Sequence, residues 1–183
     1  LSITMWATVA RTCTPPSGWT SIATTTFKES RQCYLYYKIA GASEPANYTF
    51  SFNSSVDGQN SVMGCFSGVD NTNPINAFSN IDYTDYNATI RCGSMTSTVN
   101  NCMSIIYTFY GQPSTMTTPS GYTKQLTYQP YRVNCIYTKL ITTAGATGDI
   151  DITAQFLNGQ KNAFGVMLKE ASPLNTSKFF QLF

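Results

Sequence analysis

Histidine is absent from this sequence of 183 residues, and only 11% of the residues are charged, against about a quarter in an average soluble domain. Without histidine there is no Ser-His-Asp or Cys-His catalytic group and no imidazole metal ligand. The net charge of +2 argues against nucleic acid as a partner, because such binding needs a strong basic field. No run of about 18 apolar residues occurs, so the sequence predicts no membrane span.

Cysteine is present in an even number, but no Cys-x-x-Cys pair occurs, which argues against zinc and thioredoxin-like redox sites. The six cysteines are Cys13, Cys33, Cys65, Cys92, Cys102 and Cys135. Two interpretations remain open, namely disulfides in an oxidising compartment and buried free thiols. We favour disulfides, because a lysine-poor surface of hydroxyls and amides suits an extracellular protein. Cys13–Cys33 and Cys92–Cys102 each flank an expected turn, which would leave Cys65–Cys135 as a longer tie.

Four Asn-x-Ser/Thr triplets permit N-glycosylation in a secreted protein. They begin at Asn47, Asn53, Asn87 and Asn175. A chain this rich in asparagine, serine and threonine also contains such triplets by chance. We expect Asn87 to be the most exposed of the four, because it ends the polar stretch 82–87.

Short stretches that are apolar or that alternate with a period of two recur along the chain. They lie at 1–9, 33–39, 48–52, 62–66, 103–110, 135–141, 150–156 and 163–168. They are rich in aromatic and β-branched residues and are bounded by Gly, Pro, Asn and Ser, which is typical of strands. No long segment shows helical periodicity. The sequence therefore predicts an all-β, antiparallel β-sandwich of the jelly-roll or Ig-like kind.

An internal repeat is the most informative pattern. The stretch 14–20 (TPPSGWT) recurs at 117–123 as TTPSGYT, and 40–43 (AGAS) returns at 144–147 as AGAT. Further echoes follow in order at the same offset of about 101–104 positions. We therefore expect one sandwich domain over 1–171. Its half-repeats would cover about 1–70 and 102–171, and 71–101 would connect them.

The aromatic residues have two interpretations. Trp19 and Tyr122 follow matching Pro-Ser-Gly turns, so each can pack at the sandwich end or offer a stacking platform for a sugar. Tyr83 and Tyr86 lie in a polar stretch and are candidates for an exposed contact surface with a partner.

Three stretches together resemble a known module. TPPSGW at 14–19, YYKIAGASEPANYTFSF at 36–52 and GCFSGVDNTNPINA at 64–77 are similar to a β-sandwich module of bacterial and bacteriophage surface proteins. That module occurs in tail-fibre-like and secreted adhesin-like chains, so the resemblance implies a structural or display role without catalytic residues. The six cysteines of this chain are unusual for the module. The module also has one more strand before the one that opens this sequence, which implies a free edge that a neighbour's strand can fill.

The C-terminal tail, 172–183, is apolar where a solvated terminus would be polar. Its aromatic residues are Phe179, Phe180 and Phe183. The tail either closes the chain's own sheet or lies on a neighbouring subunit, and the second arrangement would build a filament.

Acidic residues do not single out a reactive site. Asp70, Asn71 and Asn73 are better explained as turn residues than as calcium ligands, and Asp149 and Asp151 simply alternate on a strand. We expect no catalytic residue, no cofactor and no metal. The expected function is a non-enzymatic extracellular structural protein, secreted or displayed on a fibre or virion surface, whose partners are copies of itself. The alternative is a carbohydrate-binding or adhesin module with glycans as partners.

Overall fold

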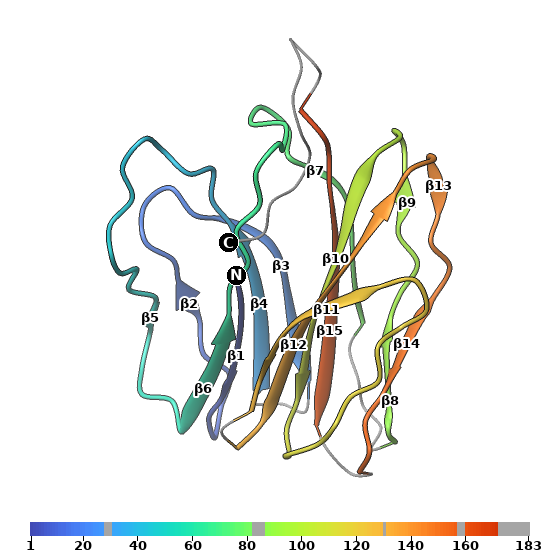
Figure 1. Ribbon diagram of the computed structural model, residues 1–183. Helices are drawn as coiled ribbons and strands as arrows, with labels where there is room; N and C mark the ends of the chain where they lie inside the picture. Colours follow the sequence, from blue (N-terminus) through green and yellow to red (C-terminus); the bar gives the residue numbers. More distant parts are fainter. Residues whose placement is uncertain (28–30, 82–86, 130, 157–159, 172–183) are drawn as a thin grey trace. The chain divides into compact units, whose positions relative to one another are not determined.

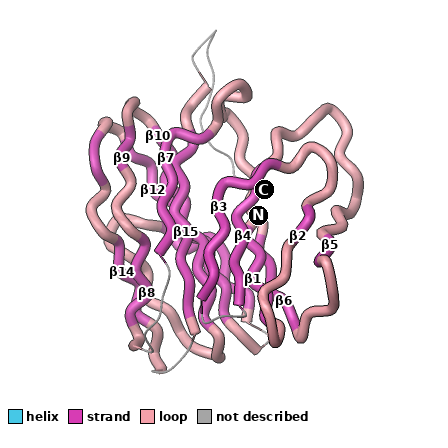
Figure 2. Tube along the Cα trace, turned by 180° about the vertical axis from the view of Figure 1, so that it is seen from behind, coloured by secondary structure: helices cyan, strands magenta, loops and turns pink. Residues whose placement is uncertain are grey.

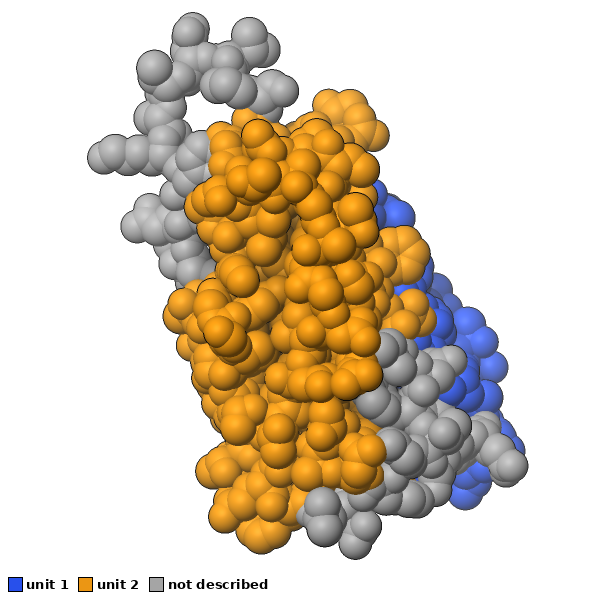
Figure 3. Space-filling view, turned by 90° about the vertical axis from the view of Figure 1, so that its right-hand side faces the viewer, with its two compact units in different colours: residues 1–61 blue, residues 62–183 orange. Residues whose placement is uncertain are grey.

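The computed structural model describes residues 1–27, 31–81, 87–129, 131–156 and 160–171. Regular structure in these ranges is entirely β, with antiparallel sheets and no helix, which confirms the all-β, antiparallel part of the predicted fold (Figure 1). Nothing in the described ranges has the length and apolar character of a membrane-crossing helix. The chain divides into two compact units, Leu1–Ser61 and Val62–Phe183, which Figure 3 colours separately.

Unit 1 is a four-stranded sheet with a short two-stranded ribbon. Its strands are β1 (Ser2–Trp6), β2 (Cys13–Thr14), β3 (Thr20–Phe27), β4 (Arg31–Tyr37), β5 (Ser51–Phe52) and β6 (Gly58–Val62). The sheet has the order β3-β4-β1-β6, and β2 pairs with β5 in the ribbon. The opening strand β1 therefore lies inside the sheet and not at its edge.

The core of unit 1 follows from the period of two in β1 and β4. Ile3 and Met5 of β1 share a face with Tyr34 and Tyr36 of β4, and all four are buried. The aromatic rings of β5 and its preceding loop cover this face, with Phe52 close to Tyr34. Aromatic pairs of this kind contribute beyond their buried area, which explains the clustering of tyrosine and phenylalanine here.

Unit 2 is built on a five-stranded sheet in the order β11-β12-β10-β15-β7. Its strands are β7 (Ile75–Ile81), β8 (Thr89–Cys92), β9 (Thr96–Ser97), β10 (Cys102–Tyr110), β11 (Thr123–Tyr128), β12 (Val133–Ile141), β13 (Gly145–Ala146), β14 (Ile150–Thr153) and β15 (Lys161–Leu168). Two short pairs, β8–β14 and β9–β13, form a second layer beside that sheet (Figures 1 and 2).

The core of unit 2 lies between this sheet and the short pairs. Ile106 and Met167 from the sheet and Ile90 and Ile152 from the second layer belong to one buried cluster. Strands β10 and β15 are buried on both faces, which explains why their sequences are nearly continuous apolar runs. Burying apolar surface on this scale is the main force that holds the two layers together.

Matching turns precede the outer strands of the two sheets. In unit 1, Gly18 has a φ of +84°, and the amide of Trp19 donates to the carbonyl of Pro16 at 3.3 Å. In unit 2, Gly121 has a φ of +74°, and the amide of Tyr122 donates to the Pro119 carbonyl at 3.1 Å. Only glycine adopts such φ values at no steric cost, so each Pro-Ser-Gly motif fixes its turn as the sequence suggested.

Irregularities in pairing also occur at matching places. The β3–β4 ladder shifts register between Ser21 and Ala23, and the β11–β12 ladder shifts between Lys124 and Leu126. In unit 1, Cys13 pairs with Phe52. In unit 2, an isolated bridge joins Met116 and Ala154.

Some expected strand boundaries are wrong. In the stretch 62–66, only Val62 belongs to a strand, because the chain turns away after β6 and Gly64 lies against the ring of Phe66. In 48–52, only Ser51–Phe52 is paired. The connection expected at 71–101 contains β7, β8 and β9, all of which belong to unit 2.

Candidate functional site

An open groove of about 610 Å³ lies within unit 2. Its walls come from the end of β12, the loop that carries β13, the start of β14 and the turn before β11. The lining residues are Pro119, Ser120, Tyr122, Lys139, Ile141, Thr143, Ala144, Gly145, Ala146, Thr147, Asp149, Ile150 and Asp151. The groove combines one aromatic ring, an ammonium group, two carboxylates and several hydroxyls, which is the chemistry of a site for a small polar ligand.

Tyr122 and Lys139 form one side of the groove. Tyr122 is half-buried, packs against the unit 2 core, and shares a 2.8 Å hydrogen bond between its hydroxyl and Oγ of Ser104. Burial raises the pKa of the Tyr122 phenol, so the ring stays neutral at ordinary pH. The Lys139 ammonium lies 5.6 Å from the centre of the Tyr122 ring, within the range of a cation–π contact.

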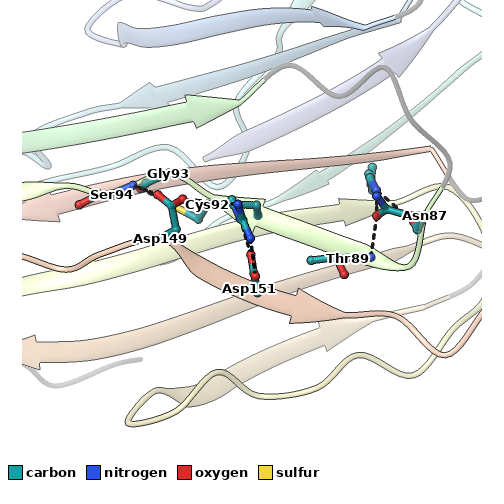
Figure 4. A network of polar contacts seen from close by, with 9 residues as sticks. Asn87, Thr89, Cys92, Gly93, Ser94, Asp149 and Asp151 are labelled. Carbon is teal, nitrogen blue, oxygen red and sulfur yellow. Dashed lines mark hydrogen bonds and ion pairs between the residues drawn. The ribbon is translucent and has the colours of Figure 1, made fainter.

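The carboxylates on the other side, Asp149 and Asp151, are labelled in Figure 4, and both pair with Arg91 of β8. Arg91 donates to both carboxylate oxygens of Asp151, at 2.7 and 2.8 Å, and lies 3.6 Å from Asp149. Asp149 also accepts a 3.0 Å hydrogen bond from the amide of Ser94. The Arg91 guanidinium lowers the pKa of Asp151, so this acid is ionised and paired. Such acids are poorly suited to be a general acid or a metal ligand, and no group of metal-binding side chains occurs in the described ranges.

Unit 1 has the same turn and the same lysine, but other side chains cover them. The Lys38 ammonium and the Tyr48 hydroxyl both donate to Oε2 of Glu44, and the amide of Gly41 donates to its Oε1. These hydrogen bonds, with that from Lys38 the strongest, lower the pKa of Glu44 to about 2. Tyr48 also packs edge-on against Trp19, with ring centres 5.1 Å apart.

The two aromatic residues of the repeat therefore have different surroundings. Trp19 packs against Tyr48 and Phe50, with ring centres 5.1 and 5.2 Å away. Tyr122 is the one that lines an open groove. The other contact candidates, Tyr83, Tyr86, Phe179, Phe180 and Phe183, lie outside the described residues.

The glycosylation candidates also differ in their surroundings. Asn47 is exposed, whereas Oδ1 of Asn53 accepts a hydrogen bond from the amide of Thr12 at 3.1 Å. Asn87 is exposed, as Asn47 and Asn53 are, and its Oδ1 accepts hydrogen bonds from the amide of Thr89 (Figure 4) and from the Lys161 ammonium. Asn175 lies outside the described residues.

None of the six cysteines, all of which lie in the described ranges, forms a disulfide in this structure, and the expected partners lie in different surroundings. Cys13 belongs to the core on one face of β4, whereas Cys33 points to the opposite face, where its Sγ lies 3.1 Å from Oγ1 of Thr4. Cys65 is exposed, but Cys135 is buried with its Sγ 3.8 Å from the sulfur of Met116. Cys33 alternates with Tyr34 and Tyr36 along β4, so the period of two places its thiol on the face away from the cluster that contains Cys13.

Cys92 and Cys102, the remaining expected pair, are both buried in the unit 2 core. The thiol of Cys102 donates to the carbonyl of Val99 at 3.6 Å and accepts from Oγ of Ser97 at 3.3 Å. Each buried thiol thus behaves as a small apolar side chain with a weak hydrogen bond.

Asp70 forms a turn and does not gather ligands around it. Its Oδ1 accepts hydrogen bonds from the amides of Thr72 and Asn73, at 2.8 and 3.0 Å, and Lys169 lies 3.4 Å from its Oδ2. The amide hydrogen bonds lower the pKa of Asp70, with the larger effect from Asn73. This geometry agrees with the interpretation of Asp70 as a turn residue.

Lys139 and Arg91 are site residues that the sequence reasoning missed. Lys139 was detectable, because the repeat aligns it with Lys38. Arg91 was not, because it lies about 60 positions from its partner Asp151 and only the pairing of β8 with β14 brings them together.

Comparisons with known proteins found no match for this chain. No family model matches the chain, and neither a curated protein nor a solved structure matches it.

Proposed function

We propose that this protein is a non-enzymatic structural subunit of an extracellular fibre, filament or particle, and that it assembles with copies of itself. In this proposal the chain is a sandwich of the jelly-roll or Ig-like kind built from two copies of one sheet unit. It is displayed on a surface and presents shape and contact area, with no reaction to perform.

The duplication is supported by features that share one offset. Cys13 pairs with Phe52 in unit 1, and Met116 pairs with Ala154 in unit 2. Met116 lies 103 positions after Cys13, and Ala154 lies 102 positions after Phe52. The turns at Gly18 and Gly121, with positive φ, are 103 positions apart. The order β3-β4-β1-β6 corresponds to β11-β12-β10-β15, and β7 is an added strand at the far edge.

The observation that carries the assembly proposal is the free edge of the unit 2 sheet at β11. Within the described ranges no strand pairs with its outer side, so its amides and carbonyls on that side are available. Leu126 and Tyr128 alternate along this strand and are 40% and 51% exposed. An exposed edge with apolar side chains is a template for strand addition by another copy.

The composition of the chain supports a role outside the cell. Few charges mean that contacts between copies depend little on salt, which suits assembly outside the cell. A lysine-poor surface of hydroxyls and amides also suits a protein that is displayed outside the cell.

Sedimentation velocity and negative-stain microscopy test this proposal on the full chain. We expect assembly that grows with concentration and that Leu126→Lys abolishes, because a charge on an edge strand blocks pairing. Val99→Lys is the matched control, since Val99 is 41% exposed but lies in the turn before β10. A wild-type protein that stays monomeric at high concentration, or equal loss in both variants, would refute the proposal.

A carbohydrate-binding or adhesin function is the second candidate, and the open groove at Tyr122 favours it. A neutral ring on the wall of a polar groove offers a face for a sugar, and the hydroxyls and carboxylates beside it can bind sugar hydroxyls. A glycan array with wild type, Tyr122→Ala and Trp19→Ala tests this function. Binding that Tyr122→Ala removes would support it, and the absence of any bound glycan would exclude it.

A further inference from the structure

We propose that the unit 2 groove binds a sugar that carries a carboxylate, such as a uronic acid, with Lys139 receiving the carboxylate. The inference rests on the proposed duplication and deepens the carbohydrate-binding candidate. Two related places in the chain, one in each unit, differ in the side chains around a shared lysine.

Unit 1 shows that a carboxylate can bind the lysine beside the Pro-Ser-Gly turn. There the aliphatic part of the lysine crosses the turn glycine, since a Cβ on Gly18 would lie 3.3 Å from Cε of Lys38. The ammonium of that lysine binds a carboxylate, Glu44, which also accepts hydrogen bonds from a tyrosine hydroxyl and a backbone amide. A charge-assisted set of this kind is stronger than neutral hydrogen bonds.

Unit 2 keeps the lysine but has no carboxylate at the position that matches Glu44. A Cβ on Gly121 would lie 3.2 Å from Cε of Lys139, so this side chain crosses its turn as Lys38 does. At the offsets of 102 and 104 positions, the counterpart of Glu44 is Ala146 or Gly148, and neither can pair with an ammonium. Lys139 has no ion pair within the described ranges.

The missing side chains also leave the space for a ligand. At the offset of 102 positions the counterpart of Tyr48 is Ile150, which is shorter, has no hydroxyl and is buried in the core. Ile150, Ala146 and Lys139 all line the groove. The groove therefore occupies the place that Glu44 and Tyr48 fill in unit 1.

The distribution of charge selects the ligand class. Lys139 has no ion-pair partner within the described ranges, whereas Asp149 and Asp151 share the one guanidinium of Arg91 and keep acceptor oxygens for further hydrogen bonds. A simple anion would use only the lysine. A uronic acid uses both sides, because its carboxylate pairs with Lys139 and its hydroxyls donate to the aspartates, while Tyr122 supports an apolar face of the ring.

Isothermal titration calorimetry with tetragalacturonate, and with cellotetraose as the neutral probe, tests the inference. We expect tetragalacturonate to bind more tightly, and Lys139→Met to weaken it about tenfold or more, the size of one charge-assisted hydrogen bond. Lys139→Arg retains the charge and most of the affinity. Ala146→Glu places a carboxylate inside the groove, as in unit 1, and lowers the affinity to a similar extent as Lys139→Met.

Lys38→Met is the matched control, because it makes the same change at the related lysine of unit 1 and leaves the groove intact. Near-ultraviolet circular dichroism on each variant shows that the fold is retained. Tetragalacturonate that binds no more tightly than cellotetraose, or that is unaffected by Lys139→Met, overturns the inference.

The titrations also separate the inference from the function on which it rests. If cellotetraose binds in a Tyr122-dependent way and the uronate shows no advantage, carbohydrate binding stands and the inference fails. If neither probe binds, the inference fails, and the glycan array decides independently whether another sugar is bound. Self-assembly is measured separately and is unaffected by either result.

Discussion

The ammonium of Lys161 donates hydrogen bonds to both the main-chain oxygen and Oδ1 of Asn87, at 3.0 and 2.5 Å, although Lys161 is only 1% exposed. Lysine is rarely buried so completely without partners for its charge. The contact ties the first residue of β15 to the turn that leads into β8. It therefore connects the main sheet of unit 2 to its second layer.

We expect Asn87→Ala to lower the free energy of unfolding by about 1–3 kcal/mol, because it removes an acceptor from a buried ammonium and from the amide of Thr89. Urea denaturation of the wild type and the variant measures the change. Asn47→Ala is the matched control, since Asn47 is also an exposed glycosylation candidate but has no hydrogen bond within the described ranges, and we expect it to change stability by less than about 0.5 kcal/mol. Equal effects of the two substitutions would contradict the role of the Lys161 contact.

The fold class could be predicted from the sequence because the alternation of apolar residues is a local property. Strands β10 and β15 coincide closely with the predicted runs at 103–110 and 163–168. Strands β3 and β11 were missed, because sequences such as TSIATTTF and TKQLTY at sheet edges are rich in polar residues. The run at 62–66 was apolar but only Val62 is in a strand, and Met63 and Cys65 are exposed, so apolar character alone gave a false strand.

The candidate site could be predicted only in part. The repeated Pro-Ser-Gly turn located Tyr122, and the repeat contained Lys139 as well. The groove is open because Ala146 and Gly148 have small or no side chains. A single sequence does not show that larger side chains would otherwise fill this space. The cysteine pairing could not be predicted, because sequence spacing does not tell which face of a strand each thiol occupies.

Gly165 lies in the middle of β15 directly under the second layer of unit 2. A Cβ at this position would lie 2.5 Å from Sγ of Cys92 and 2.8 Å from the sulfur of Met95. We expect Gly165→Ala to lower the free energy of unfolding by about 1–3 kcal/mol through overpacking. Chemical denaturation measures it, with Gly41→Ala as the control, since the nearest atom there is 3.6 Å away.

Overpacking at Gly165 also predicts that the effects of substitutions at Gly165 and Cys92 on stability are coupled. Cys92→Ala removes the closest atom, so the double variant Cys92→Ala/Gly165→Ala should be less destabilised than the sum of its two single substitutions. Simple additivity would show that Gly165 is required for a reason other than space.

The state of the cysteines can be measured directly by thiol titration. We expect one fast-reacting thiol in the native protein, Cys65, and six reactive thiols in denaturant without a reductant. Burial raises the pKa of Cys92 to about 12 and also raises that of Cys13, so these groups are protonated as well as covered. Cys65→Ser should abolish the fast reaction. Fewer than six thiols in denaturant would show that disulfides form after all.

The hydrogen bonds to the Glu44 carboxylate predict that the stability of the protein depends on pH below about 4.5. Its pKa is about 2 in the folded protein and near 4.5 when the chain is unfolded, because Lys38, Tyr48 and the Gly41 amide bind the ionised form more strongly than the protonated form. A lowered folded pKa contributes stability above the unfolded pKa, and this contribution is lost as the pH falls from about 4.5 toward 2. The thermal midpoint of the wild type should therefore fall more steeply over this range than that of Glu44→Gln.

Titration of the Glu44 carboxyl by nuclear magnetic resonance gives the same quantity without unfolding the protein. In Lys38→Met the largest cause of the shift is gone, so the pKa of Glu44 should rise toward its usual range. A pKa that is near 4.5 in the wild type, or that does not move in Lys38→Met, would show that Lys38 does not hold this carboxylate. The comparison with Lys139 would then lose its basis, because the unit 2 groove is interpreted through the carboxylate that Lys38 binds.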